Sequence, residues 1–192
     1  MTASRPRNAA RTRADILEAA RRSFALDGYD RATVRSIAAE VGVDAALVIR
    51  YFGSKEKLFV EAVDLDFGFP DVSTVSADAV AEVLLDSFFG IWDERGTFQA
   101  LLRAAVNAPF AADALQRVFT EQLAPKLIGA VPPDNPAQRI GMTAAFISGI
   151  AITRYILKTS PVVGLSREEL CRWAAPVVRT FLVGPLPTEP VG

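Results

Sequence analysis

Apolar residues recur every three or four positions through most of the chain, which is the spacing that an amphipathic helix requires. In the first such stretch the apolar face consists of Ile16, Leu17, Ala20 and Phe24. No stretch alternates apolar and polar residues with a period of two over any length, so no sheet is expected. The pattern therefore predicts an all-α protein of about nine helices.

Residues 33–57 contain two short helices and the start of a third, separated by tight turns. Thr33 is a candidate N-cap, and Gly42 ends the helix that follows, because a residue without Cβ adopts the left-handed conformation at low cost. Asp44 can cap a second helix and Ser54 a third. A helix, a glycine turn and a second helix within about 20 residues are typical of a helix-turn-helix, whose second helix can lie in the major groove of DNA.

A break at residues 67–71 divides the chain into a head and a larger body. The predicted divisions are a three-helix head over 1–53, a bridging helix over 54–66 and a helical body over 67–192. In the body, Asp134 is a candidate helix cap and Pro125 is expected to kink a helix. The body helices are expected over 76–94, 97–108, 111–130, 134 to about 158, and 168–183.

The charges are distributed unevenly along the chain. Residues 1–57 hold 11 Lys and Arg and 7 acidic residues, whereas residues 58–192 hold 10 and 15. The head therefore has a formal charge of +4 and the body one of −5. A basic head on an acidic body is typical of a polyanion-binding domain with a separate, non-binding body.

The composition argues against an enzyme. The chain has no histidine, which excludes a histidine-containing triad or zinc site, and its single cysteine excludes an internal disulfide framework. We expect no catalytic residues, no metal site and no cofactor. The most apolar run, 140–153, is too short to span a bilayer, and the N-terminus does not resemble a secretory signal. The expected compartment is the cytoplasm, with the protein on the nucleoid when it is bound to DNA.

Residues 16–59 resemble the TetR family of bacterial transcriptional regulators. The matching segments are ILEAARRSFALDGYDRATVRSIAAEVGVD and RYFGSKEKLF. The signature positions are Gly28-Tyr29, Thr33, Ile37-Ala38, Gly42-Val43, Tyr51-Phe52, Lys55-Glu56 and Leu58, all present in register.

The resemblance implies an all-α homodimer with two DNA-binding heads and a body that serves as a ligand-binding and dimerisation domain. It implies a sequence-specific regulator, expected to be a repressor that a small apolar or amphipathic ligand releases from a palindromic operator. One alternative is a DNA-binding protein without a ligand response. Another is a helical enzyme or carrier.

The candidate DNA contacts lie in and beside the second predicted helix. Arg35 can contact a guanine edge or a phosphate, Ala45, Ala46 or Leu47 can contact a thymine methyl, and Thr33 and Lys55 suit phosphates. Many members of the family have a tyrosine where this chain has Ile49, which cannot donate to a phosphate. Arg50 is the expected substitute and Tyr51 the next candidate. With few polar base contacts, DNA shape is expected to contribute to specificity.

Two further groups of residues are assigned in the body. The candidate ligand pocket comprises Phe88, Phe89, Trp92, Leu102, Arg103, Phe119 and Phe146, although aromatic residues at helical spacing are more often plain core. If Arg103 and Arg154 are buried they need partners, either an acidic ligand or one of Asp86, Asp93 and Glu121. The candidate dimer interface comprises Ala144, Ala145, Ser148, Ile152, Trp173, Val177 and Phe181, with a monomer core as the alternative.

Overall fold

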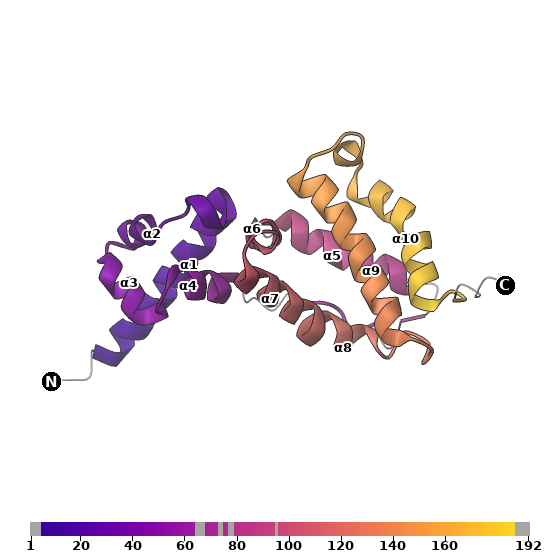
Figure 1. Cartoon of the computed structure of the whole chain (residues 1–192), viewed down its shortest axis with the longest axis horizontal. Helices are drawn as coiled ribbons and strands as arrows, with labels where there is room; N and C mark the ends of the chain where they lie inside the picture. The colour runs from indigo at the N-terminus through magenta and orange to yellow at the C-terminus, as the bar shows by residue number, and fades with distance from the viewer. Residues whose placement is uncertain (1–4, 64–67, 73–74, 77–78, 95, 187–192) are drawn as a thin grey trace. The chain divides into compact units, whose positions relative to one another are not determined.

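The computed structural model describes residues 5–63, 68–72, 75–76, 79–94 and 96–186. All regular structure in these ranges is helical, as the apolar spacing predicts (Figure 1). Within the same ranges no helix combines the length and apolarity needed to cross a membrane. Contacts divide the chain into two compact units, residues 1–66 with 94–116 and residues 67–93 with 117–192.

The first unit is built on one long helix. Its helices are α1 (Arg5–Arg31), α2 (Val34–Val41), α3 (Ala45–Phe52), α4 (Lys55–Val63), α6 (Gly96–Ala105) and α7 (Pro109–Arg117). The helix α1 contacts α2, α3, α4 and α6, and its apolar stripe is fully buried at Ile16, Ala20 and Phe24. Gly28, with φ 77° and ψ 173°, interrupts the helical backbone near the end of α1.

The helices α6 and α7 belong to this first unit, although the sequence places them in the body. Phe98 and Leu101 of α6 are buried, and α6 contacts both α1 and α4. The approach is close at Gly96, where an added Cβ would lie 3.0 Å from the Cβ of Ala25. The compact unit around α1 is therefore larger than the three-helix head predicted from local pattern.

The second unit contains the remaining described helices. They are α5 (Val80–Glu94), η1 (Val118–Leu123), α8 (Ala124–Leu127), α9 (Pro136–Ala151), η2 (Ile152–Ile156), η3 (Val162–Gly164) and α10 (Arg167–Val183). Figure 1 shows α9 and α10 side by side. Ion pairs join α10 to α5, from Arg167 to Asp86 at 2.7 Å and from Arg179 to Glu82.

Two predicted helices of the body continue as π-helical turns. A kink is predicted at Pro125, and the structure has the π-helical segment η1 immediately before it. Pro125 itself lies in the first turn of α8. Proline has no N–H to donate into the helix, and the wider turn is consistent with this loss. The helix predicted to reach about residue 158 is α-helical only to Ala151 and π-helical through Ile156.

The cap predicted for α9 is wrong, because Asp134 serves a different purpose. The residue before α9 is Asn135, with φ 55°, and it makes no side-chain cap. The Asp134 carboxylate instead accepts a hydrogen bond from Nη2 of Arg139 at 2.8 Å, and this bond holds the pKa of Asp134 below its usual value.

Arg139 is buried and satisfies the C-terminal end of α10. Its side chain is 3% exposed, and Nη1 donates to the carbonyl oxygens of Phe181 and Gly184 at 3.2 and 2.9 Å. Such carbonyl groups have no partner within their own helix. Arg139 therefore joins the start of α9 to the end of α10, and nothing in the sequence pattern predicts this.

We expect Arg139→Ala to lower the free energy of unfolding by about 2–4 kcal/mol, because it leaves buried carbonyl groups without donors. The measurement is urea denaturation at one fixed protein concentration. Arg172→Ala, at an exposed position on α10, is the matched control and should change stability by less than about 0.5 kcal/mol. Equal midpoints for the two variants would contradict the assigned role of Arg139.

Candidate nucleic-acid interface

The turn between α2 and α3 is fixed by the caps that the sequence predicts. Thr33 Oγ1 accepts from the backbone N–H of Ser36 at 3.0 Å, and Ser36 Oγ accepts from the Thr33 N–H at 3.2 Å. Gly42 has φ 73° and ends α2 in the left-handed conformation. Asp44 Oδ1 accepts from the N–H of Ala46 at 2.7 Å and so caps α3. These bonds determine where the helix-turn-helix bends.

The helix α3 has one buried and one exposed face. Val48 is fully buried and Phe52 is 6% exposed, so these two residues hold the helix on the unit. Ala46, Ile49 and Arg50 are exposed on the opposite face. Ala45 and Leu47 are only half-buried and lie at its edges. Of the three residues predicted to contact a thymine methyl, Ala46 is the one that is exposed.

Several arginines of the head are occupied by partners within the protein. Arg13 donates to Glu61 of α4 at 2.7 Å and its guanidinium carbon lies 4.6 Å from the centre of the Phe52 ring. Arg22 donates to Glu40 of α2 at 2.7 Å. These side chains hold α1 against its neighbours.

Other cations of the head are available to an external partner. Arg35 and Arg50 are exposed, and neither has a carboxylate partner in the part of the chain that the structure describes. The guanidinium carbon of Arg50 lies 5.9 Å from the centre of the half-buried Tyr51 ring. The positive charge predicted for the head therefore separates into cations with internal partners and cations without them.

Lys55 is positioned by Tyr29 at the end of α1. Its Nζ lies 4.3 Å from the centre of the Tyr29 ring and 3.5 Å from the carbonyl oxygen of Asp30. The Tyr29 hydroxyl donates to Oε1 of Glu56 at 3.1 Å. Burial, followed by the bond to Glu56, raises the pKa of Tyr29 to about 12, so the phenol stays protonated. The aromatic residue after Gly28 was the only sequence signal for this arrangement.

The residues predicted to form a ligand pocket are divided between the two compact units. Phe88, Phe89 and Trp92 are buried in the second unit, with at most 2% exposure. Leu102 and Arg103 belong to the first unit, where Leu102 is buried and Arg103 is exposed. Of the remaining two, Phe119 is half-buried in η1 and Phe146 lies on α9.

Carboxylate partners are expected for Arg103 and Arg154 if their side chains are buried, and the structure shows Arg103 exposed and both side chains bonded to other groups. Arg103 donates to Gln99 at 3.4 Å. Nη1 of Arg154 donates to the carbonyl oxygens of Val162 and Leu165 at 3.0 and 2.8 Å. Arg154 therefore closes the segment between η2 and α10, and neither arginine needs an acidic ligand to explain its position.

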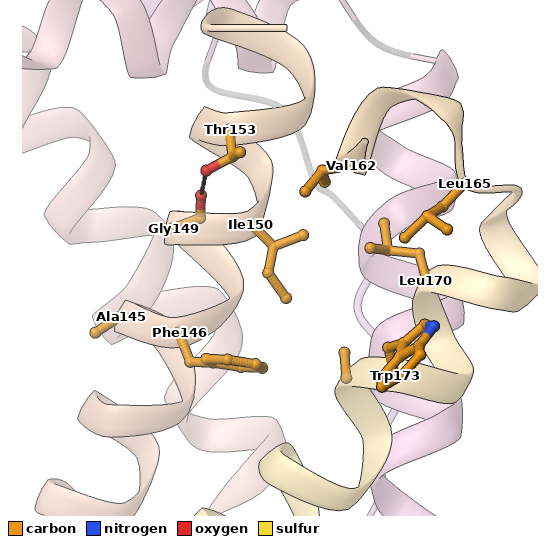
Figure 2. Close-up of a pocket in the computed structure, with 10 residues that line it drawn as sticks. Ala145, Phe146, Gly149, Ile150, Thr153, Val162, Leu165, Leu170 and Trp173 are labelled. Carbon is orange, nitrogen blue, oxygen red and sulfur yellow. Dashed lines mark hydrogen bonds between the residues drawn. The ribbon is translucent and has the colours of Figure 1, made fainter. Parts of the chain in front are cut away.

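An apolar groove runs between α9 and α10 (Figure 2). Its volume is about 490 Å³, and Phe146 and Ile150 of α9 face Leu165, Leu170 and Trp173 across it. Trp173 is 75% exposed, although tryptophan is a residue that proteins usually cover. Phe146, which is predicted for the ligand pocket, therefore lines the same groove as residues that are predicted for the dimer interface.

The predicted interface residues lie along the same two helices. On α9, Ala145 is exposed and Ala144 and Ser148 are half-buried, with half-buried Ile152 following in η2. On α10, Trp173 and Val177 are exposed. Phe181 is half-buried, with its ring centre 6.0 Å from that of Phe146.

A capped helix-turn-helix whose exposed cations include some without carboxylate partners among the described residues, joined to a helical body, is typical of a DNA-binding transcription regulator. Two family models match this chain: "Bacterial regulatory proteins, tetR family" over residues 16–62 and "Tetracyclin repressor-like, C-terminal domain" over residues 78–182. The second match spans more than half of the chain, and the protein belongs to the TetR family. The predicted family is confirmed.

Individual relatives agree with this assignment. The chain is 40% identical over 73 residues to the HTH-type transcriptional repressor AcnR of Corynebacterium efficiens, a match that spans 38% of each chain. It is 45% identical over 49 residues to AcnR of Corynebacterium glutamicum, 26% of each chain. The chain thus matches well under half the length of these curated relatives.

Solved structures extend the likeness to most of the chain. A TetR-family regulator from Streptomyces coelicolor A3 is 29% identical, with 90% of this chain and 95% of that chain covered and a TM-score of 0.62. The multidrug binding protein EbrR, solved in complex with proflavin, is 18% identical, with 88% and 99% covered and a TM-score of 0.59. At that identity EbrR supports the fold alone.

Proposed function

We propose that this protein is a transcriptional repressor that binds a palindromic operator as a homodimer in the cytoplasm. The observation that carries the proposal is the exposure of Arg35 and Arg50, without carboxylate partners in the described residues, beside an outward face of α3. Arg13 and Arg22 of the same head are paired with glutamates, so Arg35 and Arg50 are the arginines proposed to meet an external partner. Such a surface suits double-stranded DNA, which presents base edges in the grooves between its phosphates.

The contacts divide into those that position the head and those that select a sequence. Thr33 and Lys55 begin α2 and α4, whose N-terminal N–H groups and partial positive charge favour phosphate. Arg35 and Arg50 have the donors to bind either phosphate or the O6 and N7 atoms of guanine. Tyr51 can add a phosphate contact. The proposed apolar contacts of α3 with the bases come from Ala45, Ala46 and Leu47.

The groove between α9 and α10 supports the dimer. Trp173 and Met142 are 75% and 53% exposed, and a second copy of the same surface would cover them. Small residues on α9, such as Ala145 and Gly149, permit close approach of helices. Two heads related by a two-fold axis would then meet two half-sites of a palindrome.

The ligand that releases the repressor from its operator is proposed to be a small apolar or amphipathic molecule bound in the second unit. The aromatic lining available there is Phe88, Phe89 and Trp92 on α5, which would have to move because these side chains are buried. That packing favours the second candidate, a DNA-binding regulator without a ligand response.

The proposal is tested by selecting binding sites from random DNA and measuring affinity at matched salt. We expect a palindromic site that is bound at least about 10³-fold more tightly than random DNA. Footprinting upstream of the protein's own gene should find the same sequence. Affinity for the selected site that does not exceed affinity for random DNA would contradict the regulator assignment.

Lys55→Ala should weaken binding to every DNA sequence and lower the slope of log affinity against log salt by about 1 per head. The reason is that one phosphate contact is lost with its released counterion. The measurement is fluorescence anisotropy over a salt series. Lys55→Arg should keep the slope, and so should Arg22→Ala, whose cation is already paired with Glu40. An unchanged slope in Lys55→Ala would refute the phosphate contact.

Trp173→Glu should raise the dissociation constant of the dimer at least about 100-fold, because it places unpaired carboxylates in an apolar interface. Analytical ultracentrifugation over a concentration series measures this constant. Val106→Glu, at a position 74% exposed in the first unit, is the matched control and should remain dimeric. A dimer of unchanged strength in Trp173→Glu would place the interface elsewhere.

A further inference from the structure

The outward face of α3 carries a large apolar side chain that the described residues of the unit cover only in part. Ile49 is 42% exposed, whereas Val48 and Phe52 of the same helix are buried. Ala46 lies one turn before Ile49 and is also exposed, so the two residues form a continuous apolar strip. Arg50, the next residue, is the cation beside this strip.

We propose that Ile49 is a specificity-determining residue that contacts the C5-methyl group of a thymine in the major groove. This inference rests on the proposed function, because it requires that α3 lies against DNA base edges. The inference assigns to Ile49 a direct role in selecting the DNA sequence. The resemblance to the family indicates only that a phosphate donor is missing at this position.

The chemistry of the groove selects thymine. Guanine, adenine and cytosine present acceptors or amino groups at the major-groove edge, and thymine alone adds a methyl group. An isoleucine pressed against an acceptor or amino group would remove water from it and supply no hydrogen bond in return. Against a thymine methyl, the same side chain buries apolar surface on both sides.

The neighbouring residues leave this role to Ile49. The Asp44 carboxylate accepts the N–H of Ala46 at 2.7 Å as a helix cap, and an ionised carboxylate has no donor to offer a base. Ala46 has a single methyl and a shorter reach than Ile49. Arg50 supplies the donors and the charge, and its position next to Ile49 keeps the apolar contact within a cationic surface.

The test uses the full-length protein and its selected operator, with each thymine replaced in turn by deoxyuridine, which lacks only the C5-methyl group. We expect about a fourfold loss of affinity at one thymine in each half-site, the effect of one buried methyl. Ile49→Ala should lose a similar factor on the natural operator. It should lose nothing further when deoxyuridine is placed at that thymine.

Two controls make the result specific. Ile49 is exposed, so Ile49→Ala should keep the circular dichroism spectrum and melting temperature of the parent protein. Leu26→Ala, at a position 79% exposed on α1, should keep the full sensitivity to deoxyuridine.

The inference is overturned if no thymine is sensitive, which would mean that Ile49 packs on sugar rather than on a base. It is also overturned if Ile49→Ala keeps the sensitivity, which would assign the methyl contact to Ala46 or Leu47. Failure to select any preferred site is a different result, because it contradicts the proposed function itself.

Discussion

The edge-to-face contact between Phe24 of α1 and Phe59 of α4 is the interaction on which the head depends. Both rings are fully buried, with centres 4.9 Å apart. Tyr29 packs on the same ring of Phe59 at 5.1 Å, and Tyr29 in turn holds Lys55 over its face. Each aromatic pair contributes only about 1 kcal/mol beyond its buried area. Their shared geometry nevertheless fixes the start of α4, so that the proposed phosphate contact is tied directly to the hydrophobic core.

The same cluster explains why α6 and α7 fold with the head. Phe110, in the first turn of α7, lies 5.0 Å from Tyr29 and 6.0 Å from Phe59 between ring centres. The chain leaves the second unit after α5, passes through α6 and α7, and returns to it at η1. Residues 96–116, which lie in the sequence between the two segments of the second unit, are therefore packed as helices of the first unit.

Local rules predicted the helix-turn-helix well because its turns depend on near neighbours. Thr33, Gly42 and Asp44 act within three or four residues of their own positions, and the sequence shows that spacing directly. The same rules failed where the partner is distant. Arg139 bonds to carbonyl groups more than 40 positions away, and α6 packs on α1 across about 80 positions, and no periodicity encodes either pairing. Asp134 has the residue type of a cap but has a stronger partner in Arg139, so residue type alone misassigned it.

Affinity and specificity have different physical sources on this interface. The cations proposed to contact phosphates, such as Lys55, would act through phosphates and released counterions, so their contribution would fall as salt rises and be equal for all sequences. An apolar contact at Ile49 discriminates mainly by exclusion, since a polar base edge left without water or a partner costs more than a methyl contact gains. That cost does not depend on counterions. Discrimination at the position facing Ile49 should therefore persist at salt concentrations that weaken binding overall, which separates this apolar contact from the guanidinium contacts beside it.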